Sequence, residues 1–279
     1  MKKSLSLIFS FVLFLCCCFC IINTPIIANA ADENRFGVAV PYGGMIQGYV
    51  EEDVYYSRKD EIERYVNPYN LPVYLACEID NACAITAGGA IIGHFDRIYE
   101  ELIPNHDGKS FMGQFVYCSQ DDAVDEMHRE LYKRMGSTSE GTTVAGYKNG
   151  MTSYVESKGR SIEISSIFSK SSLNKSAYMS ALEAGKLLTV FMDGFSIVSF
   201  AGGIKSNDGY DTIYSTVVKG LHTVAAYGYK CVKYYDVSDK LIQEDNYLYV
   251  HTGFSSATLS MIRLNKNITI KDGYIINIT

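Results

Sequence analysis

The chain has 279 residues, of which 47% are hydrophobic and 20% charged, and its formal net charge at pH 7 is −6. An acidic chain without a basic cluster argues against nucleic acid and anionic membranes as partners. Four of its eight cysteines lie within the first twenty residues, so too few remain for a disulfide-stapled scaffold.

The first thirty residues have the features of a secretory signal peptide. Lys2 and Lys3 form a basic start, residues 5–22 are apolar, and Ala28-Asn29-Ala30 is a small-residue cleavage site. We expect a secreted mature chain that starts near Ala31, with a net charge of −8 because the two lysines leave with the leader. A retained membrane anchor is the alternative. No second long apolar run follows, so no stable membrane insertion is expected after the leader is removed.

Residues 31–70 are polar and rich in tyrosine, and two interpretations stay open. They form either an N-terminal arm that lies across the domain or a short propeptide. Within them, residues 60–65 are expected to form a short helix, and residues 71–75 a short strand leading into the next turn.

The segment from Asn81 to Arg97 is the most informative part of the chain. Small and apolar residues recur at helical spacing, which predicts a buried helix with Asp80 or Asn81 as its N-cap and Cys83 in its first turn. The N-terminus of a helix carries a partial positive charge that favours a thiolate over a thiol, so Cys83 is a candidate nucleophile. A small core residue at this position is the alternative interpretation.

Three further helices are expected between the Cys83 helix and residue 185. The apolar face of the first helix comprises Val124, Met127, Leu131 and Met135, and that of the second comprises Tyr147, Met151, Tyr154 and Val155. Gly159 is expected to close the second helix, and a short third helix covers residues 176–184. His106 and His128 are expected in a loop and on a helix surface, and His94 is expected on a surface or between helices, too far along its helix from Cys83 to act on it.

Strand patterns dominate from residue 160 onward. The expected strands are residues 161–168, two runs forming a hairpin around Asp193-Gly194, residues 220–230, and residues 247–250, 259–264 and 274–278. His222 lies at the start of the strand over residues 220–230. The sequence therefore predicts an α+β domain with a helical N-terminal half, an antiparallel sheet in the C-terminal half and the active-site cleft between them.

Two segments resemble motifs of the secreted bacterial C39-like cysteine peptidases, which belong to the papain-like superfamily. Asn81-Ala82-Cys83-Ala84-Ile85-Thr86-Ala87 is similar to the nucleophile motif N-x-C-G-P-T-A, with Ala84 and Ile85 in place of Gly and Pro. Leu221-His222-Thr223-Val224, followed by Gly228-Tyr229, is similar to the base motif G-H-x-V-x-x-x-G-Y, with Leu221 in place of Gly. The order of cysteine before histidine also fits this superfamily. The resemblance implies a papain-like fold over residues 71–279.

The resemblance also implies a reaction. Cys83 would attack a peptide bond of a peptide or protein substrate, with His222 as the base and a thioester as the intermediate. No cofactor is implied, the cysteine and histidine spacings predict no metal site, and a monomer is expected.

Two further site residues are assigned from this chain's departures from the motif. The family's oxyanion glutamine is replaced by Cys77, followed by Glu78, so Asn81 is assigned as the nearest amide donor. The family's orienting Asn or Asp is also missing from the strand after His222. His251 is assigned that role, with Thr252, or Asp236 or Asp245 from a loop, as alternatives.

These missing groups keep other functions open. A catalytically weak or inactive secreted binding domain is one alternative. A cell-wall peptide amidase that uses the same cysteine and histidine is another.

Overall fold

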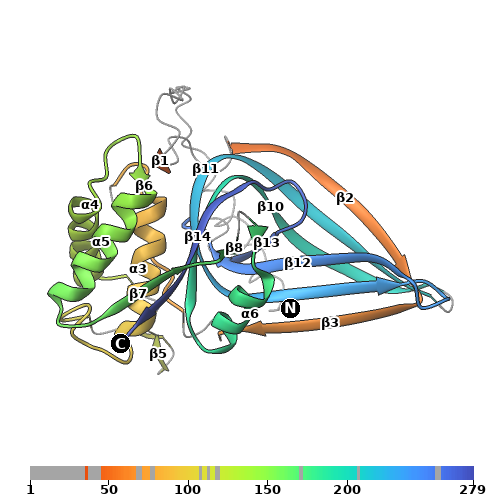
Figure 1. The fold of residues 1–279 in the computed structure, drawn as a ribbon, viewed down its shortest axis with the longest axis horizontal. Coiled ribbons are helices and arrows are strands. Elements are labelled where there is room, and N and C mark those ends of the chain that lie inside the picture. Colours follow the sequence, from red (N-terminus) through yellow and green to blue (C-terminus); the bar gives the residue numbers. More distant parts are fainter. Residues whose placement is uncertain are drawn as a thin grey trace, which may run out of the picture.

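The computed structural model describes residues 35–36, 45–66, 71–75, 79–106, 109–111, 114–116, 120–169, 172–205, 208–254 and 259–279. The predicted signal peptide, Cys77, Glu78 and Cys118 lie outside these residues. The helices are α3 (Cys83–Asp96), α4 (Asp122–Arg134), α5 (Val144–Ser157) and α6 (Lys175–Glu183). Helices α3, α4 and α5 group at one end of the molecule, and long strands extend from the other (Figure 1).

One large antiparallel sheet dominates the fold. Its strands are β2 (Ile46–Tyr56), β3 (Arg58–Tyr65), β7 (Ile162–Ser166), β10 (Leu187–Lys205), β11 (Asp208–Tyr235), β12 (Leu241–His251), β13 (Leu259–Arg263) and β14 (Ile270–Ile278). The strand order is β2-β11-β12-β13-β10-β14-β7, with β3 also paired to β11 and β10 also paired to β11. Small two-stranded ladders join β1 (Arg35–Phe36) with β6 (Thr142–Thr143), β4 (Lys109–Phe111) with β5 (Gln114–Val116), and β8 (Phe168–Ser169) with β9 (Ser172–Leu173).

The predicted fold class is wrong. The protein is mostly β-sheet, with 50% strand and 25% helix, and its N-terminal half is not helical. Strands β2 and β3 come from the N-terminal part of the chain, yet they pair with β11 in the main sheet, at residues 209–218 and 228–235 respectively. The segment over residues 60–65 is thus part of a strand rather than a helix, and residues 71–75 form no strand.

Strand β10 also differs from its prediction. The Asp193-Gly194 pair does not make a hairpin, because β10 continues through it and stays paired with β11 on both sides. Gly194 has φ +73° and faces Gly220, with φ +110°, at a break in register. Glycine adopts positive φ without steric cost, so the two glycines allow a bulge that bends the long strands.

The helix predictions after residue 120 are confirmed, and capping explains their starts. The Asp121 side chain accepts a hydrogen bond from the Val124 N–H at the start of α4, and Thr143 does the same for Gly146 in α5. The predicted apolar residues of both helices are buried. Gly159 and Gly185 follow α5 and α6 with positive φ, as expected of residues that end helices.

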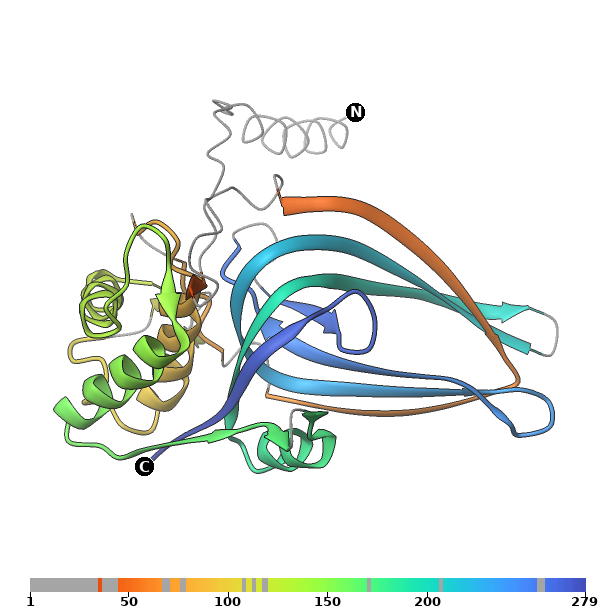
Figure 2. The same ribbon diagram turned by 45° about the horizontal axis from the view of Figure 1, so that its top comes forward.

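The side chains pack into three cores. The first lies between the helices and the sheet and includes Cys83, Phe191 and Ala225. The second lies beyond the other face of these strands, towards α6, and includes Met192, Val224 and Phe254. The third comprises residues of the long strands β2, β10, β11 and β12, whose course Figure 2 shows, and its buried residues are Val54, Val198, Ile213, Val232, Tyr234 and Tyr247.

Candidate active site

Cys83 is the first residue of α3, as predicted, but its surroundings differ from expectation. The N-cap is Ala82, which offers no capping side chain, so the prediction of Asp80 or Asn81 in that position is wrong. The Cys83 side chain is therefore close to the free amides at the helix end. Burial raises the pKa of Cys83 to about 11, although the N–H groups of Thr223, Ala84 and Cys83 itself, with the Thr223 hydroxyl, act in the opposite direction. A thiol in this environment is neutral at pH 7.

His222 lies in β11 with its ring stacked between two phenylalanines. The ring centroids of Phe195 and Phe254 are 5.5 and 4.5 Å from that of the imidazole. Nε2 lies 2.8 Å from the carbonyl oxygen of Thr252, and a carbonyl can only accept, so this nitrogen carries the proton. In the neutral ring Nδ1 is then an acceptor, and it is buried without a partner among the described residues. Burial lowers the pKa of His222 to about 4, despite the opposing effect of the Thr252 carbonyl.

The structure brings the segments of Cys83 and His222 together but does not join their side chains. Thr223, the next residue after His222, approaches the Cys83 sulfur. Neighbouring strand residues point to opposite faces, and the register pairs Thr223 with Phe191 and His222 with Met192. Cys83 thus packs in the first core and His222 among residues of the second, with no hydrogen bond between them in the described structure.

The segment that holds the His222 imidazole also contacts α3. A Cβ atom built on Gly253 would lie 3.4 Å from Cγ2 of Thr86, and Thr86 is one helical turn after Cys83. The Thr252 carbonyl, which fixes the His222 tautomer, therefore belongs to a segment that packs against α3, the helix that begins at Cys83.

Asn81 does not present its amide to Cys83 in the way that its assignment as oxyanion donor requires. Its Nδ2 donates a hydrogen bond to the carbonyl of Ser139, and its backbone has φ +55°. The donors close to the sulfur are the N–H and hydroxyl of Thr223 and the N–H groups at the start of α3. They are the groups that could bind an oxyanion.

Among the described residues, neither ring nitrogen of His251 has a hydrogen-bond partner of normal geometry. It pairs with Ala225 across the β11–β12 ladder, so it lies on the α3 side of the sheet, opposite to His222. Burial, and then the nearby His128, lowers its pKa to about 4. The hydrogen-bond partner of His222 is the backbone carbonyl of Thr252. Thr252 was one of the alternatives to His251 for the orienting role.

Of the three other histidines, His128 is buried and not on a helix surface, whereas His106 lies in a loop, as expected. His94 is 6% exposed and His128 is fully buried, and the buried side chain of His106 contacts Asp121 and Tyr74. A signal for His128 was present in the sequence, because it lies four residues after Val124 and three before Leu131 on the apolar face of α4.

An open pocket of about 350 Å³ lies next to the start of α3. Its lining residues are Ile79, Asp80, Arg129, Tyr132, Lys133 and Ser139. Asp80 precedes Asn81 directly, and Ser139 accepts the Asn81 hydrogen bond, so the pocket is continuous with the loop that leads to Cys83. Two cations against one carboxylate give the pocket a net positive lining.

Among the described residues, no group of three or more His, Cys, Asp or Glu side chains is arranged to hold a metal ion. The part of the chain that the structure describes also has no helix with the length and apolar character needed to span a membrane. Searches against models of protein families, against curated proteins and against solved structures gave no match to this chain.

Proposed function

We propose that the protein is a secreted cysteine peptidase, or a related amide hydrolase, in which Cys83 is the nucleophile and His222 the base. The observation that supports this most is the state of the His222 ring. The Thr252 carbonyl holds the proton on Nε2, so the buried lone pair of Nδ1 has no partner among the described residues. The next residue, Thr223, contacts the Cys83 sulfur. Thiol activation needs a base such as His222 in contact with the sulfur. Because His222 and Thr223 point to opposite faces of β11, this contact requires a rearrangement of the strand.

The described form corresponds to a resting state. Burial favours the neutral thiol and the neutral imidazole, since it raises the pKa of Cys83 to about 11 and lowers that of His222 to about 4. Proton transfer between them therefore needs a substrate or an opening motion that admits polar groups and lets the imidazole reach the sulfur.

The chemistry follows from these groups. Nδ1 of His222 accepts the thiol proton, and the Cys83 thiolate adds to the amide carbonyl carbon. The resulting oxyanion accepts hydrogen bonds from the N–H groups at the start of α3. His222 then returns the proton to the departing amine, and a water molecule, deprotonated by Nδ1, hydrolyses the thioester.

The pocket beside the α3 start would hold a substrate side chain. Arg129 and Lys133 outnumber Asp80 there, so we expect substrates with an acidic side chain near the scissile bond.

The test measures the alkylation rate of each cysteine against pH, by peptide mass spectrometry, on the wild type and His222→Ala, together with hydrolysis of a peptide library. Cys231 is the matched control, because it is also a free, buried thiol. We expect substrate peptides to protect Cys83, but not Cys231, from alkylation, because they occupy the Cys83 sulfur as a thioester, and His222→Ala to remove this protection by preventing acylation. Cys83→Ala should lower hydrolysis at least about tenfold, a loss of about 1.4 kcal/mol in transition-state stabilisation, while Cys231→Ala should not. A smaller loss with Cys83→Ala would falsify the catalytic role.

A second candidate function is a secreted binding domain without catalysis. The separate packing of Cys83 and His222, and the engagement of the Asn81 amide by Ser139, favour this reading. Cleavage of library peptides that stops on thiol alkylation would exclude it. Release of amino groups from cell-wall preparations without casein cleavage would instead indicate a cell-wall peptide amidase.

A further inference from the structure

The long strands form a second pocket, separate from the Cys83 region. Its volume is about 380 Å³, within the range of small-molecule sites. Its lining residues are Tyr56, Lys59, Glu61, Phe200, Ala201, Gly202, Gly203, Asp211, Lys230 and Val232. They come from β2, β3, β10 and β11, and the end of β2 that contributes Tyr56 is remote from helices α3–α5 (Figure 1).

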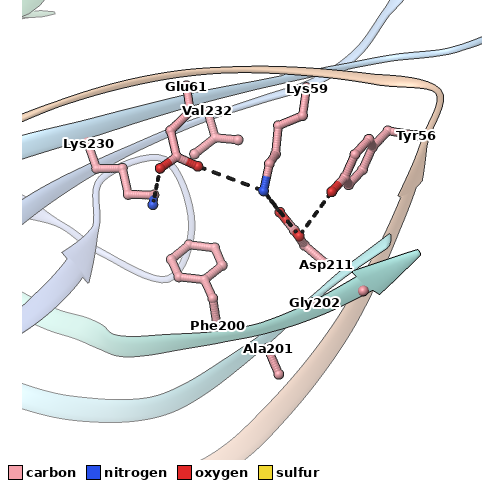
Figure 3. A pocket seen from close by; sticks show the side chains of 10 residues that line it. Tyr56, Lys59, Glu61, Phe200, Ala201, Gly202, Asp211, Lys230 and Val232 are labelled. Carbon is pink, nitrogen blue, oxygen red and sulfur yellow. Dashed lines mark hydrogen bonds and ion pairs between the residues drawn. The ribbon is translucent and has the colours of Figure 1, made fainter. Parts of the chain in front are cut away.

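One wall of this pocket is a row of alternating charges (Figure 3). Lys230 lies 2.6 Å from Glu61, and Lys59 lies 3.8 Å from Glu61 and 2.9 Å from Asp211. The Tyr56 hydroxyl donates to the same Asp211 carboxylate at 3.3 Å. Two ammonium groups and two carboxylates give this wall no net charge.

An apolar surface on β10 adjoins the row of charges, and Gly202 is the cross-strand partner of Asp211. The Phe200 ring faces the row of charges, with the Lys230 ammonium 5.2 Å from its centroid, and Ala201 and Gly202 follow along β10 (Figure 3). A Cβ atom on Gly202 would lie 2.6 Å from Oδ1 of Asp211, so glycine at this position leaves room for the carboxylate. The pocket therefore presents an aromatic ring beside fixed polar groups.

The polar wall keeps unused hydrogen-bonding capacity. The side chains of Lys59 and Glu61 are 28% and 32% exposed. An ammonium has three donors and a carboxylate about four acceptor positions, which exceeds the contacts these groups make with each other. A ligand with hydroxyl groups can add to the row without breaking an ion pair, because each hydroxyl both donates and accepts. An ionic ligand would have to displace one of the existing partners.

We propose that this pocket binds a neutral saccharide, with the apolar C–H face of a sugar ring on Phe200 and its hydroxyls on Lys59, Glu61 and Lys230. The apolar face gains from burial against an aromatic ring, and the charge-assisted hydrogen bonds to the hydroxyls set its orientation. This binding is independent of the Cys83 chemistry.

The test is isothermal titration of the mature protein with neutral monosaccharides (glucose, galactose, mannose, N-acetylglucosamine) and their trisaccharides, and with phosphate and glutamate as ionic probes. We expect at least one neutral saccharide to bind at millimolar concentration or below, and more tightly than either ionic probe. Phe200→Leu keeps the apolar packing but removes the ring, and it should weaken binding at least about tenfold. Tyr214→Leu is the matched control, because Tyr214 is 43% exposed and lies outside this pocket. It should leave the affinity unchanged.

A second measurement does not depend on a variant. Acetylation of lysines, followed by peptide mass spectrometry, should show that the saccharide protects Lys59 and Lys230 but not Lys271, which lies outside the pocket. The proposal is overturned if no neutral saccharide binds, if phosphate or glutamate binds more tightly, or if the saccharide leaves Lys59 and Lys230 unprotected. Loss of binding in Tyr214→Leu would likewise overturn the proposal, because it would show that the saccharide binds in the pocket lined by Tyr49 and Tyr214.

Discussion

At the scale of single residues, the site around Cys83 is governed by burial. Cys83 is 8% exposed and His222 is 1% exposed, so desolvation dominates the pKa values of both. The polar groups near the sulfur only partly offset it. Thr223 is the one that contributes through both its backbone and its side chain, and it is also the neighbour of His222.

Replacement of Thr223 by valine tests this balance. The shape is conserved, but the hydroxyl that lowers the pKa of Cys83 is removed. We expect alkylation of Cys83 to become a few-fold slower at pH 8, because a smaller fraction is thiolate, while Cys231 keeps its rate. Because the hydroxyl makes no hydrogen bond of normal geometry, unfolding in urea should change by no more than about 1 kcal/mol. Faster alkylation of Cys83 would contradict the assigned role.

At the scale of elements, α3 is shaped by what packs against it. Two of its glycines, Gly89 and Gly93, leave room for side chains of other segments. A Cβ atom on Gly89 would lie 2.3 Å from Nε2 of His128, and one on Gly93 would lie 2.5 Å from the Tyr74 hydroxyl. The close contact of α3 with α4 and with the Tyr74 segment therefore depends on these residues.

Gly89→Ala should destabilise the protein although alanine is the better helix former. Alanine gains about 1 kcal/mol in helix propensity, but the buried His128 ring has to move, and such overpacking typically costs about 1–3 kcal/mol. We expect a net loss of up to about 2 kcal/mol in the free energy of unfolding by urea denaturation. Gly48→Ala in β2 is the control, because no atom lies within 4 Å of its Cβ position. Equal stabilities of the two variants would refute the packing argument.

At the scale of the whole molecule, four of the five histidines are buried as neutral groups. Burial lowers the pKa values of His94, His128, His222 and His251 to about 4. In the unfolded chain a histidine titrates near its ordinary value of about 6.5. Between these values the unfolded state binds more protons, so the stability falls as the pH is lowered from about 6.5 to 4.

The expected slope approaches about 1.4 kcal/mol per pH unit for each such histidine near pH 5. Asp96 acts in the opposite direction, because burial raises its pKa to about 6, so the net effect corresponds to about three protons. Urea unfolding at a series of pH values between 7.5 and 4.5 measures this dependence. His128→Phe should lower the slope by about one proton. A stability that stays constant from pH 7 to pH 5 would show that these histidines are hydrated.

The sequence by itself determined the local features of this protein. Apolar spacing located α4 and α5, and a turn followed by small residues placed Cys83 in the first turn of α3. These predictions succeeded because their physical causes lie within one or two helical turns of the chain.

Only the tertiary structure decided the fold class and the relation between Cys83 and His222. Strand β3 is charged on both faces, so no apolar alternation marks it, and its inward charges such as Lys59 are paired by residues of β11 more than 150 positions away. The Asp193-Gly194 pair became a bulge instead of a hairpin because Gly220, brought opposite by β11, shares the same break in register. Likewise, the face of β11 to which His222 points depends on its pairing with β10, which no local pattern specifies.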